Sequence, residues 1–393
     1  MIDAPHERYR DRLAALATDQ PLLEPLRRAG QALGWWTGER TWRRSYARFA
    51  AGADAYAMLV LESDAEPQAL AVVEIFEQRP AESPRLPVFP APDLGWIRIE
   101  SFAEDPALPT LPEVLRARRA PVVARYRPRH RCTIRFGVGS RARYAKVFAG
   151  DGGARIHEAG MALWAAAARG ELGFQVARPD RWDPRTRTLW QYAVPGHPLV
   201  DRLVGSAGPA LVRRIGAAAG SLTRASLPCD ERFDAAAQLE RTRRAATALG
   251  RLVPGLARPA GALLQRLADV HATVVPRPLR PIHGAPHPSQ WLDDGEVLGL
   301  VDFDRAAAGD PELDVATFLA ELEAEGDRQA PMEQLEGELI AAYEAAAGPL
   351  DAALLRAYRG HKRLAKAHRS ARALVPDGDA RAARHLAFAA EAL

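Results

Sequence analysis

The sequence has few cysteines and no long hydrophobic run. Only Cys132 and Cys229 occur among its 393 residues, which excludes a disulfide framework and a zinc site built on thiolates. No segment approaches the roughly 18 consecutive apolar residues of a membrane helix, and the polar, charged N-terminus does not resemble a signal peptide. These absences predict a cytoplasmic protein that has no membrane partner.

The charges are also nearly balanced. The chain has 53 Lys+Arg and 49 Asp+Glu, a formal net charge of +4, and this excess is too small to indicate a nucleic-acid partner. At 48% hydrophobic and 26% charged residues, the composition excludes disordered, collagen-like and coiled-coil classes. We therefore expect a globular protein that does not bind nucleic acid.

Lysine is the rarest of the common charged residues. It occurs only at Lys146, Lys362 and Lys366, so arginine supplies nearly every other cation. A guanidinium is a flat fork, whereas an ammonium is a compact charge that fits between phosphate oxygens and a carboxylate. Lys146, alone in the first 361 residues, is therefore either a position where arginine cannot serve or a surface lysine kept by chance.

Hydrophobic periodicity divides the chain into three parts. Residues 1–120 have helical spacing followed by strand-like alternation, residues 121–196 are rich in strands, and residues 197–393 are mostly helical. The expected elements of the first two parts are helices at Tyr9–Leu33 and Ala154–Arg169 and strands at Ala55–Leu61, Ala69–Phe76, Trp96–Glu100, Val122–Tyr126, Cys132–Phe136, Arg143–Phe148, Gln175–Arg178 and Thr188–Val194. A strand-rich unit joined to a helical unit predicts two lobes with a ligand cleft between them.

One polar loop interrupts the helical part at Leu279–Asp304. It contains the Gln290 amide and the Asp302 carboxylate on either side of a short hairpin around Asp294-Gly295. Strand pairing across that turn would bring the two side chains together, and hard oxygen ligands of this kind suit Mg²⁺ held jointly with phosphates. The spacing alone favours an ordinary hairpin with solvated acids.

The loop sequence itself is more specific. His283-Gly-Ala-Pro-His-Pro-Ser-Gln290 is followed by Asp302-Phe-Asp304 and by Gly309-Asp-Pro-Glu-Leu-Asp314. This resembles the catalytic region of the aminoglycoside phosphotransferase and choline kinase-like family, whose pattern is His-Gly-Asp, a second His, Asn or Gln, Asp-Phe, and Gly-Asp-Pro followed by Asp. The resemblance extends over about residues 121–360.

The resemblance implies an α+β, protein-kinase-like bilobal fold. Residues 1–120 would be an N-terminal α+β extension, residues 121–196 a nucleotide-binding lobe, and residues 197–393 a helical lobe with the catalytic loop and acceptor site. The implied activity is ATP- and Mg²⁺-dependent phosphorylation of a hydroxyl on a small molecule, which would be a sugar, aminosugar or amino alcohol.

The family pattern also implies roles for residues that bind the nucleotide. Lys146 falls on the strand that carries the family's nucleotide lysine, and Glu158 falls on the next helix, where the partner of that lysine would be. The stretch Gln191-Tyr-Ala-Val-Pro-Gly196 resembles the segment whose backbone bonds adenine. Gln191 and Ala193 are therefore the implied adenine contacts.

The catalytic loop receives its roles in the same way. The resemblance implies that Asp302 is the main magnesium ligand and Gln290 the second. His283 and Asp310 would mainly hold the loop in shape, and Asp314 would brace the loop and the helix that follows.

Ala285 departs from the family pattern, because it occupies the position of the catalytic aspartate. Removing a general base typically costs a hundred- to ten-thousandfold in rate. The chain is therefore a weak enzyme, a natural pseudokinase that binds ligands and regulates a partner through residues 1–120, or an inactivated variant. Asp304 and His287 are candidate substitute bases. Charge neutralisation and positioning by magnesium and lysine could leave residual activity.

The phosphate loop also departs from the pattern. The turn Arg127-Pro-Arg-His-Arg131 has no glycine, so its backbone cannot cradle phosphates in the usual way. Its arginines could instead bind phosphate through bidentate side-chain contacts, or they could form a solvated face.

Overall fold

The computed structural model describes residues 20–34, 41–49, 55–63, 69–82, 86–91, 94–203, 205–229, 231–325 and 332–393. Of the helix expected at Tyr9–Leu33, the part from Gln20 is described, and it forms α2 (Gln20–Ala32). The rest of that predicted helix lies outside the described residues.

The first sheet belongs to the N-terminal part. It is antiparallel with the order β1-β2-β3-β5-β4. Its strands are β1 (Trp42–Phe49), β2 (Ala55–Ser63), β3 (Leu70–Phe76), β4 (Val88–Ala91) and β5 (Gly95–Ser101). All seven residues of β3 are buried, because the sheet is covered on both faces. The apolar core on one face includes Leu22 and Leu26 of α2.

The second sheet packs against the other face of the first. It too is antiparallel, with the order β6-β7-β8-β10-β9. Its strands are β6 (Pro121–Arg127), β7 (Arg131–Phe136), β8 (Arg143–Phe148), β9 (Pro179–Asp183) and β10 (Thr188–Tyr192). Val60 and Val72 of the first sheet share one core with Cys132 and Ile134 of the second.

Short helices and one long helix complete this half of the molecule. The segment between the sheets forms η1 (Phe102–Glu104) and α3 (Leu111–Arg116), and the β7–β8 turn contains η2 (Gly139–Arg141). The long helix α4 (Gly153–Ala168) contacts β9 and β10. The helix predicted at Ala154–Arg169 is therefore confirmed.

The strand predicted at Gln175–Arg178 is wrong. In that segment Gln175 makes only an isolated bridge to Gly299. The edge strand β9 instead starts at Pro179 and pairs with β10, where a proline is tolerated because an edge strand has one unpaired side. Strand β1 was not predicted, since its arginine-rich sequence has no clear apolar alternation.

The C-terminal part consists mainly of helices. They are α5 (Val200–Leu203), α6 (Gly208–Leu222), α7 (Ala235–Leu252), α8 (Ala257–Thr273), α9 (Pro311–Glu325), α10 (Met332–Ala347), α11 (Ala352–Arg372) and α12 (Gly378–Ala392), with the short η3 (Pro254–Leu256). Helix α11 contacts α7, α8, α9 and α12, and α6 packs on α10. Leu364 on α11 is completely buried in this core, a burial that typically contributes about 2 kcal/mol.

Two small three-stranded sheets lie where the polar loop was predicted. Their orders are β11-β14-β15 and β12-β16-β13. The elements are β11 (His197–Pro198), β12 (Arg232–Phe233), β13 (Arg280–Ile282), η4 (Pro288–Gln290), β14 (Trp291–Asp293), β15 (Leu298–Leu300) and β16 (Ala307–Gly309). These sheets position the candidate catalytic loop between the two halves.

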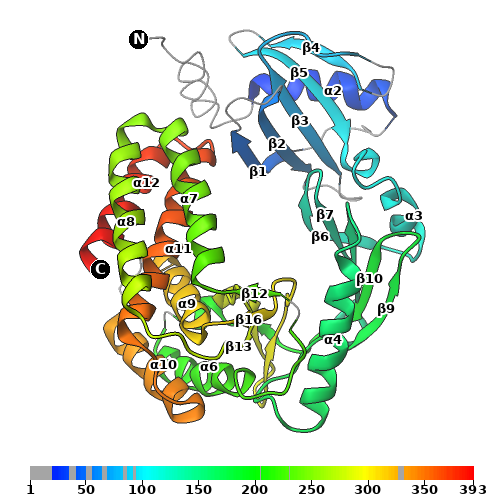
Figure 1. Ribbon diagram of the computed structural model, residues 1–393. Helices are drawn as coiled ribbons and strands as arrows, with labels where there is room; N and C mark the ends of the chain where they lie inside the picture. Colours follow the sequence, from blue (N-terminus) through cyan, green and yellow to red (C-terminus); the bar gives the residue numbers. More distant parts are fainter. Residues whose placement is uncertain are drawn as a thin grey trace.

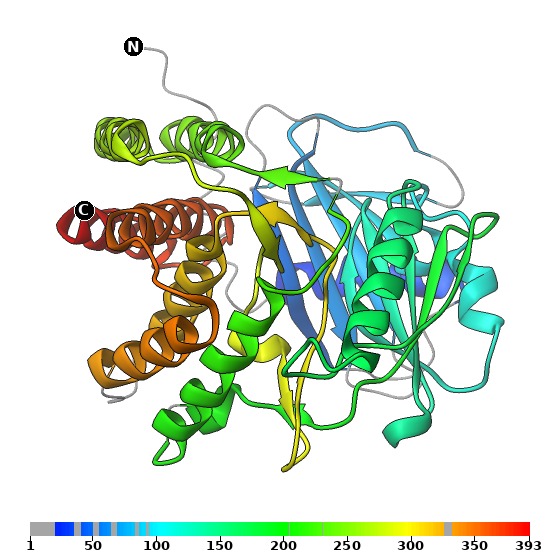
Figure 2. The same cartoon turned by 60° about the horizontal axis from the view of Figure 1, so that its bottom comes forward.

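Figures 1 and 2 show the two large sheets, with α2, α3 and α4 beside them, on one side of the molecule and the helices of the C-terminal part on the other. The chain passes from one half to the other after β10. The halves also meet elsewhere, because β1 contacts α11 and Arg44 donates a hydrogen bond to the carbonyl of Leu374 at 3.3 Å. The fold is α+β and protein-kinase-like with an N-terminal extension, as predicted. No helix in the described ranges combines the length and apolar character needed to cross a membrane.

Candidate active site

The candidate catalytic loop begins directly after β13. Gly284 has φ +81°, and a Cβ at this position would collide with the carbonyl oxygen of Arg305, so the turn requires glycine. The Asp314 carboxylate accepts hydrogen bonds from the backbone N–H groups of His283 at 2.6 Å and Gly284 at 2.8 Å. Complete burial raises the pKa of Asp314 to about 6, although these two bonds oppose the shift. Asp314 thus fixes the shape of the loop.

The imidazole of His283 ties the same loop to the end of β15. It is 1% exposed, and its Nε2 lies 3.1 Å from the carbonyl oxygen of Val301. The ring also contacts Phe303, with centroids 4.4 Å apart. Burial lowers the pKa of His283 to about 4, which keeps the ring neutral and suits it to a structural position.

The hairpin β14–β15 brings Gln290 and Asp302 together, as the spacing predicts. Trp291 pairs with Leu300 across the hairpin, and the amide nitrogen of Gln290 lies 3.3 Å from an Asp302 carboxylate oxygen. The amide oxygen of Gln290 accepts a hydrogen bond from the His287 N–H at 2.7 Å. In this arrangement the predicted ligand oxygen of Gln290 therefore faces His287 rather than Asp302.

Lys146 on β8 joins two carboxylates. Its ammonium is 2.6 Å from Asp302 Oδ1 and 2.6 Å from Asp304 Oδ1. The guanidinium of Arg131, from β7, bonds Asp304 and lies 3.7 Å from Asp302. The four alternating charges compensate one another in a partly buried site, where an isolated charge would be costly.

The pKa shifts in this cluster follow from burial and charge. Burial lowers the pKa of Lys146, and Asp302 opposes that shift. Burial would raise the pKa of Asp302, but the charges of Lys146 and Arg131 outweigh it, so this pKa lies well below its usual value. The backbone of Asp302 also has φ +72°, a conformation that is strained for most residues.

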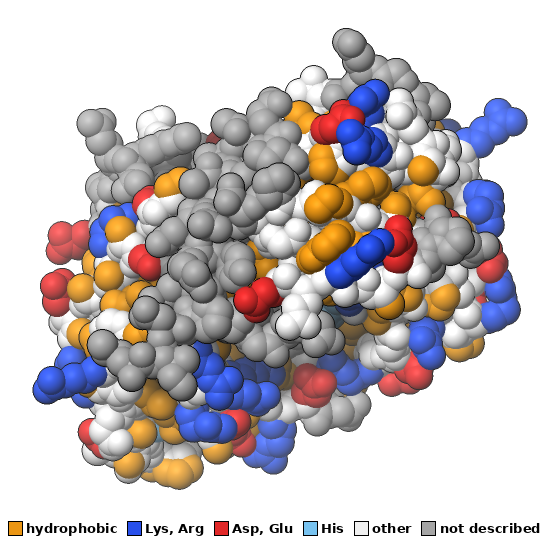
Figure 3. All heavy atoms as spheres, turned by 90° about the horizontal axis from the view of Figure 1, so that it is seen from above, with side chains coloured by type: hydrophobic (Ala, Val, Ile, Leu, Met, Phe, Trp, Pro, Cys, Tyr) orange, Lys and Arg blue, Asp and Glu red, His pale blue; other side chains and the backbone are white. Residues whose placement is uncertain are grey.

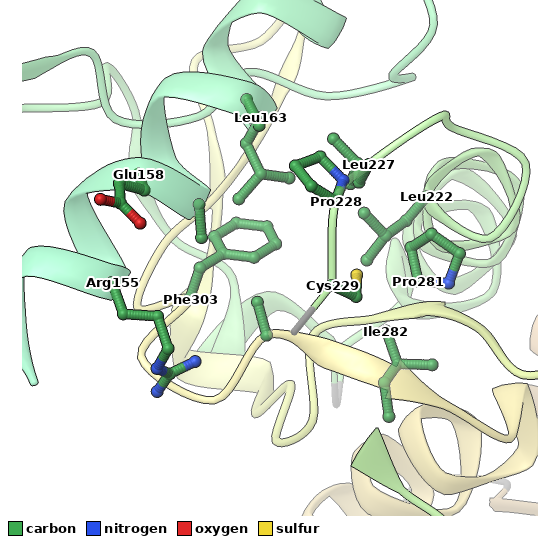
Figure 4. Close-up of a pocket in the computed structure, with 13 residues that line it drawn as sticks. Arg155, Glu158, Leu163, Leu222, Leu227, Pro228, Cys229, Pro281, Ile282 and Phe303 are labelled. Carbon is green, nitrogen blue, oxygen red and sulfur yellow. The ribbon is translucent and has the colours of Figure 1, made fainter. Parts of the chain in front are cut away.

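The structure does not bring Glu158 and Lys146 together. Figure 4 shows Glu158 and Arg155 of α4 at one side of Phe303, in a separate pocket of about 130 Å³ that Cys229 also lines. The neighbouring His157 lines the Lys146 cavity instead, because successive helix residues point about 100° apart. Among the described residues Asp302 and Asp304 are the ion-pair partners of Lys146.

The predicted adenine segment borders the same small cavity. Gln191 lines it together with Lys146, Val176 and Asp302. The Ala193 N–H donates a hydrogen bond to the Ala142 carbonyl at 3.0 Å and is therefore already engaged. The cavity measures about 30 Å³, room for little more than a water molecule, so a nucleotide requires the surrounding side chains to move.

The arginines of the β6–β7 turn have three different surroundings. Arg131 contacts Asp304, as described above. Arg129 lies toward the N-terminal sheet, 3.2 Å from Glu74 and 3.1 Å from Asp105. Arg127 lines an open cleft. The turn is thus neither a uniform phosphate loop nor a uniform solvated face.

Ala285 is partly exposed between Gly284 and Pro286. Both candidate substitute bases are already in contact with charges. Asp304 is held by Lys146, and the His287 ring lies 3.6 Å from Glu321. Each side chain already has a charged partner, so neither is positioned to act as a general base.

Two further residues lie near the loop: Asp310, which was predicted to hold the loop in shape, and Lys362, for which no role was predicted. Asp310 accepts a hydrogen bond from the hydroxyl of Tyr358 at 2.6 Å, which links the loop to α11. On the same helix, burial lowers the pKa of Lys362 to about 7, with Arg305 adding to the shift and Asp314 opposing it. The scarcity of lysine was the sequence signal that could have drawn attention to Lys362.

Comparison with known proteins places this arrangement in a family. The sequence pattern described as "Phosphotransferase enzyme family" matches residues 153–374, which is more than half of the chain. A comparison with curated proteins gave no match.

Similar solved structures include a choline/ethanolamine kinase family protein from Mesorhizobium loti, with 18% identity, a TM-score of 0.49, and coverage of 74% of this chain and 93% of that chain. An aminoglycoside-3'-phosphotransferase of type VIII has 23% identity, a TM-score of 0.49, and coverage of 66% and 99%. Aminoglycoside phosphotransferase APH(3'')-Id from Streptomyces rimosus has 22% identity, a TM-score of 0.44, and coverage of 63% and 92%.

Proposed function

Because the chain belongs to the phosphotransferase enzyme family, we propose that it transfers the γ-phosphoryl group of ATP to a hydroxyl of a small molecule in a Mg²⁺-dependent reaction. The observation that carries this proposal is the position of Lys146, whose ammonium bonds both Asp302 and Asp304 at 2.6 Å. A lysine and two carboxylates at the junction of a β-rich and a helical half are the charges that phosphoryl transfer needs.

The residues present fit a magnesium ion. Asp302 and Asp304 offer two adjacent carboxylates, and Mg²⁺ bound with phosphates needs only one or two. Gln290 would become a ligand after a half-turn of its amide, which exchanges its oxygen and nitrogen. Bound there, Mg²⁺ would neutralise charge on the transferred phosphoryl group. Lys146 would then bind phosphate oxygens in place of the carboxylates.

The remaining predicted roles are part of the same proposal. The backbone near Gln191 and Ala193 remains the proposed adenine contact, and the Ala193 N–H would have to leave the Ala142 carbonyl to take part. Glu158 would serve Lys146 only after a movement of α4. We also keep the division of the chain at residues 120 and 196, which the separation of the two sheets and the helices supports.

Catalysis at this site proceeds without the carboxylate that the family has at Ala285. Positioning and charge neutralisation carry most of the rate in phosphoryl transfer, so a weak activity on a sugar, aminosugar or amino alcohol is expected in the cytoplasm. The alternative function is that of a pseudokinase, which binds nucleotide and regulates a protein partner through residues 1–120. Ala285 and the narrow cavity beside Lys146 favour that alternative.

Calorimetric titration with ATP tests the proposal. We expect binding to the unmodified chain that depends on Mg²⁺ and is lost in Asp302→Ala. Asp201→Ala is the matched control, because Asp201 is exposed on α5 and should leave binding unchanged. Absence of ATP binding by the folded unmodified protein would contradict both the enzyme and the nucleotide-binding pseudokinase. Binding without phosphotransfer to any acceptor would favour the pseudokinase.

A further inference from the structure

A second and larger cleft lies between β1, β6 and the C-terminal end of α11. Its volume is about 840 Å³. The charged side chains that line it are Arg43, Arg48, Glu62, Arg125, Arg127, His130, Arg369 and Arg372. Seen from above, a group of Lys and Arg side chains also appears in the lower middle of the molecular surface (Figure 3). The cleft is therefore both roomy and strongly basic.

The positive charge of this cleft is largely uncompensated. Glu62 is the acidic residue that lines the cleft, and its carboxylate lies 3.4 Å from Arg43. A second lining arginine, Arg369, is bonded to Glu321 at 2.8 Å. The other four lining arginines have no carboxylate partner among the residues that the structure describes. These four are Arg48, Arg125, Arg127 and Arg372.

The lining cations also act on one another. Partial burial lowers the pKa of Arg127, and the charges of Arg125 and Arg131 add to the shift. Burial and the charge of Arg48 lower the pKa of Arg372. A hydrogen bond with Tyr46 opposes this shift. Like charges held together in a partly desolvated cleft repel one another, and a bound anion would relieve that repulsion.

The cleft borders the candidate active site at two of its walls. Arg127 stands at one wall and pairs across the β6–β7 hairpin with Arg131, which bonds Asp304. Helix α11 contributes Arg369 to another wall, and Arg369 bonds Glu321, which lies 3.6 Å from the His287 ring of the candidate catalytic loop. A molecule seated in the cleft would therefore lie next to the position proposed for the transferred phosphoryl group.

We propose that this cleft is the acceptor site and that the acceptor is a small hydroxyl compound carrying at least one phosphate group. This inference rests on the proposed phosphotransfer and narrows its substrate class. Arginine forks bind phosphate through paired, charge-assisted hydrogen bonds. A cationic amine would be repelled by the same residues, so amino alcohols and aminosugars without phosphate are disfavoured acceptors.

The test uses fructose 1,6-bisphosphate as the probe, with the full-length protein saturated by a non-hydrolysable ATP analogue and magnesium. Fructose and glucosamine are the uncharged and cationic comparison compounds. The test variant is Arg48→Gln/Arg372→Gln. The matched control is Arg356→Gln/Arg384→Gln, which removes two exposed arginines from α11 and α12 and changes the net charge equally. Circular dichroism melting confirms that both variants fold.

We expect calorimetric binding of fructose 1,6-bisphosphate that is at least about fivefold weaker in the test variant and changes less than about twofold in the control. Binding of fructose or glucosamine at least as tight as that of the bisphosphate would overturn the proposal. So would equal losses in both variants, which would indicate general charge attraction. Tight binding of a short single-stranded RNA, without binding of the bisphosphate, would also overturn the proposal, because it would identify the ligand of the cleft as nucleic acid rather than a small acceptor.

The failure of the proposed function gives a different pattern. If the protein does not bind ATP, the same titration is made without the analogue. Bisphosphate binding that the test variant loses would then show an anion site independent of phosphotransfer, which overturns its assignment as an acceptor site. If ATP binds and the bisphosphate does not, the nucleotide site stands and the acceptor inference falls.

Discussion

The Asp314 carboxylate in α9 accepts a hydrogen bond from the backbone N–H of His283, which follows β13, at 2.6 Å. The contact joins the first turn of α9 to the loop that carries Ala285. The carboxylate is 8% exposed, and its second oxygen bonds the N–H of Gly284. The geometry of the candidate catalytic loop therefore depends on one buried side chain outside it.

Asp314→Asn tests this dependence. An amide can accept only one of the two hydrogen bonds, and it places its NH₂ group against the other backbone N–H. We expect the free energy of unfolding to fall by about 2 kcal/mol, as for loss of a hydrogen bond to a charged group. Urea denaturation measures the change, with Asp201→Asn as an exposed control. An unchanged midpoint would show that the loop keeps its shape without Asp314.

Ala285→Asp should restore the group that the family has at this position. Ala285 is partly exposed, so a carboxylate at this position need not be fully buried. We expect phosphotransfer to increase at least about tenfold, because a positioned base contributes a hundredfold or more. Ala285→Asn is the matched control, since it has the same shape and cannot accept the proton. Equal rates for the two variants, with an acceptor shown to bind, would contradict the enzyme.

Lys146→Met should make the protein respond to magnesium. The change leaves Asp302 and Asp304 with Arg131 alone, and breaking a buried ion pair typically costs about 3 kcal/mol. A divalent cation can replace part of the lost charge, so magnesium should raise the melting temperature of this variant more than that of the unmodified protein.

Lys366→Met provides the control for that experiment. Lys366 is similarly buried and bonds Glu321 at 2.5 Å, and among the residues that the structure describes Glu321 is its one ion-pair carboxylate. Differential scanning fluorimetry compares both variants with and without magnesium chloride. An equal magnesium effect in both would show that the Asp302–Asp304 pair has no special affinity for the ion.

Acid should destabilise the fold through its buried histidines. His361 is completely buried, with ring nitrogens 2.7 Å from Thr242 Oγ1 and 2.9 Å from His271 Nε2. Burial lowers the pKa of His361 to about 3, and nearby His271 and Lys362 add to the shift. Because the folded pKa lies below the ordinary 6.5, the unfolded chain binds more protons between these values. Stability is therefore fully present above pH 6.5 and declines as the pH falls.

The decline is at most about 1.4 kcal/mol per pH unit for one histidine. Urea denaturation at several values between pH 7.5 and 5 (about one unit on either side of the ordinary histidine pKa) measures the slope. His361→Gln should have a shallower slope, since its side chain does not titrate. A slope equal to that of the unmodified protein would assign the acid sensitivity to other groups.

Much of the fold follows from local sequence patterns. The strands around Lys146 and the helices near Leu364 have the periodicities of sheet and helix, and the hairpin spacing correctly brings Gln290 to Asp302. Strand β1 has no such signal, because its burial pattern is set by the neighbouring strand and by α11. Edge strand β9 is likewise defined by its pairing with β10 rather than by its own residues.

The contacts of the candidate site could be predicted only where the contacting residues belong to the same sequence motif. Asp302 belongs to the recognisable motif and was predicted as a magnesium ligand. Its contact with Lys146, like that of Asp304, was not predicted, because both contacts depend on how the two lobes close. The direction of Glu158 depends on the rotation of α4, and a sequence pattern cannot fix that rotation to within one residue.

The shared core between the two sheets makes the N-terminal part inseparable from the rest. Val60 and Val72 cover Cys132 and Ile134 of the second sheet. A chain shortened to begin at residue 121 would expose this apolar face to water, and an exposed patch of that kind promotes aggregation. The described strands of the first sheet are therefore not a detachable module. They cover one face of the second sheet, so a shortened chain must keep them to bury that face.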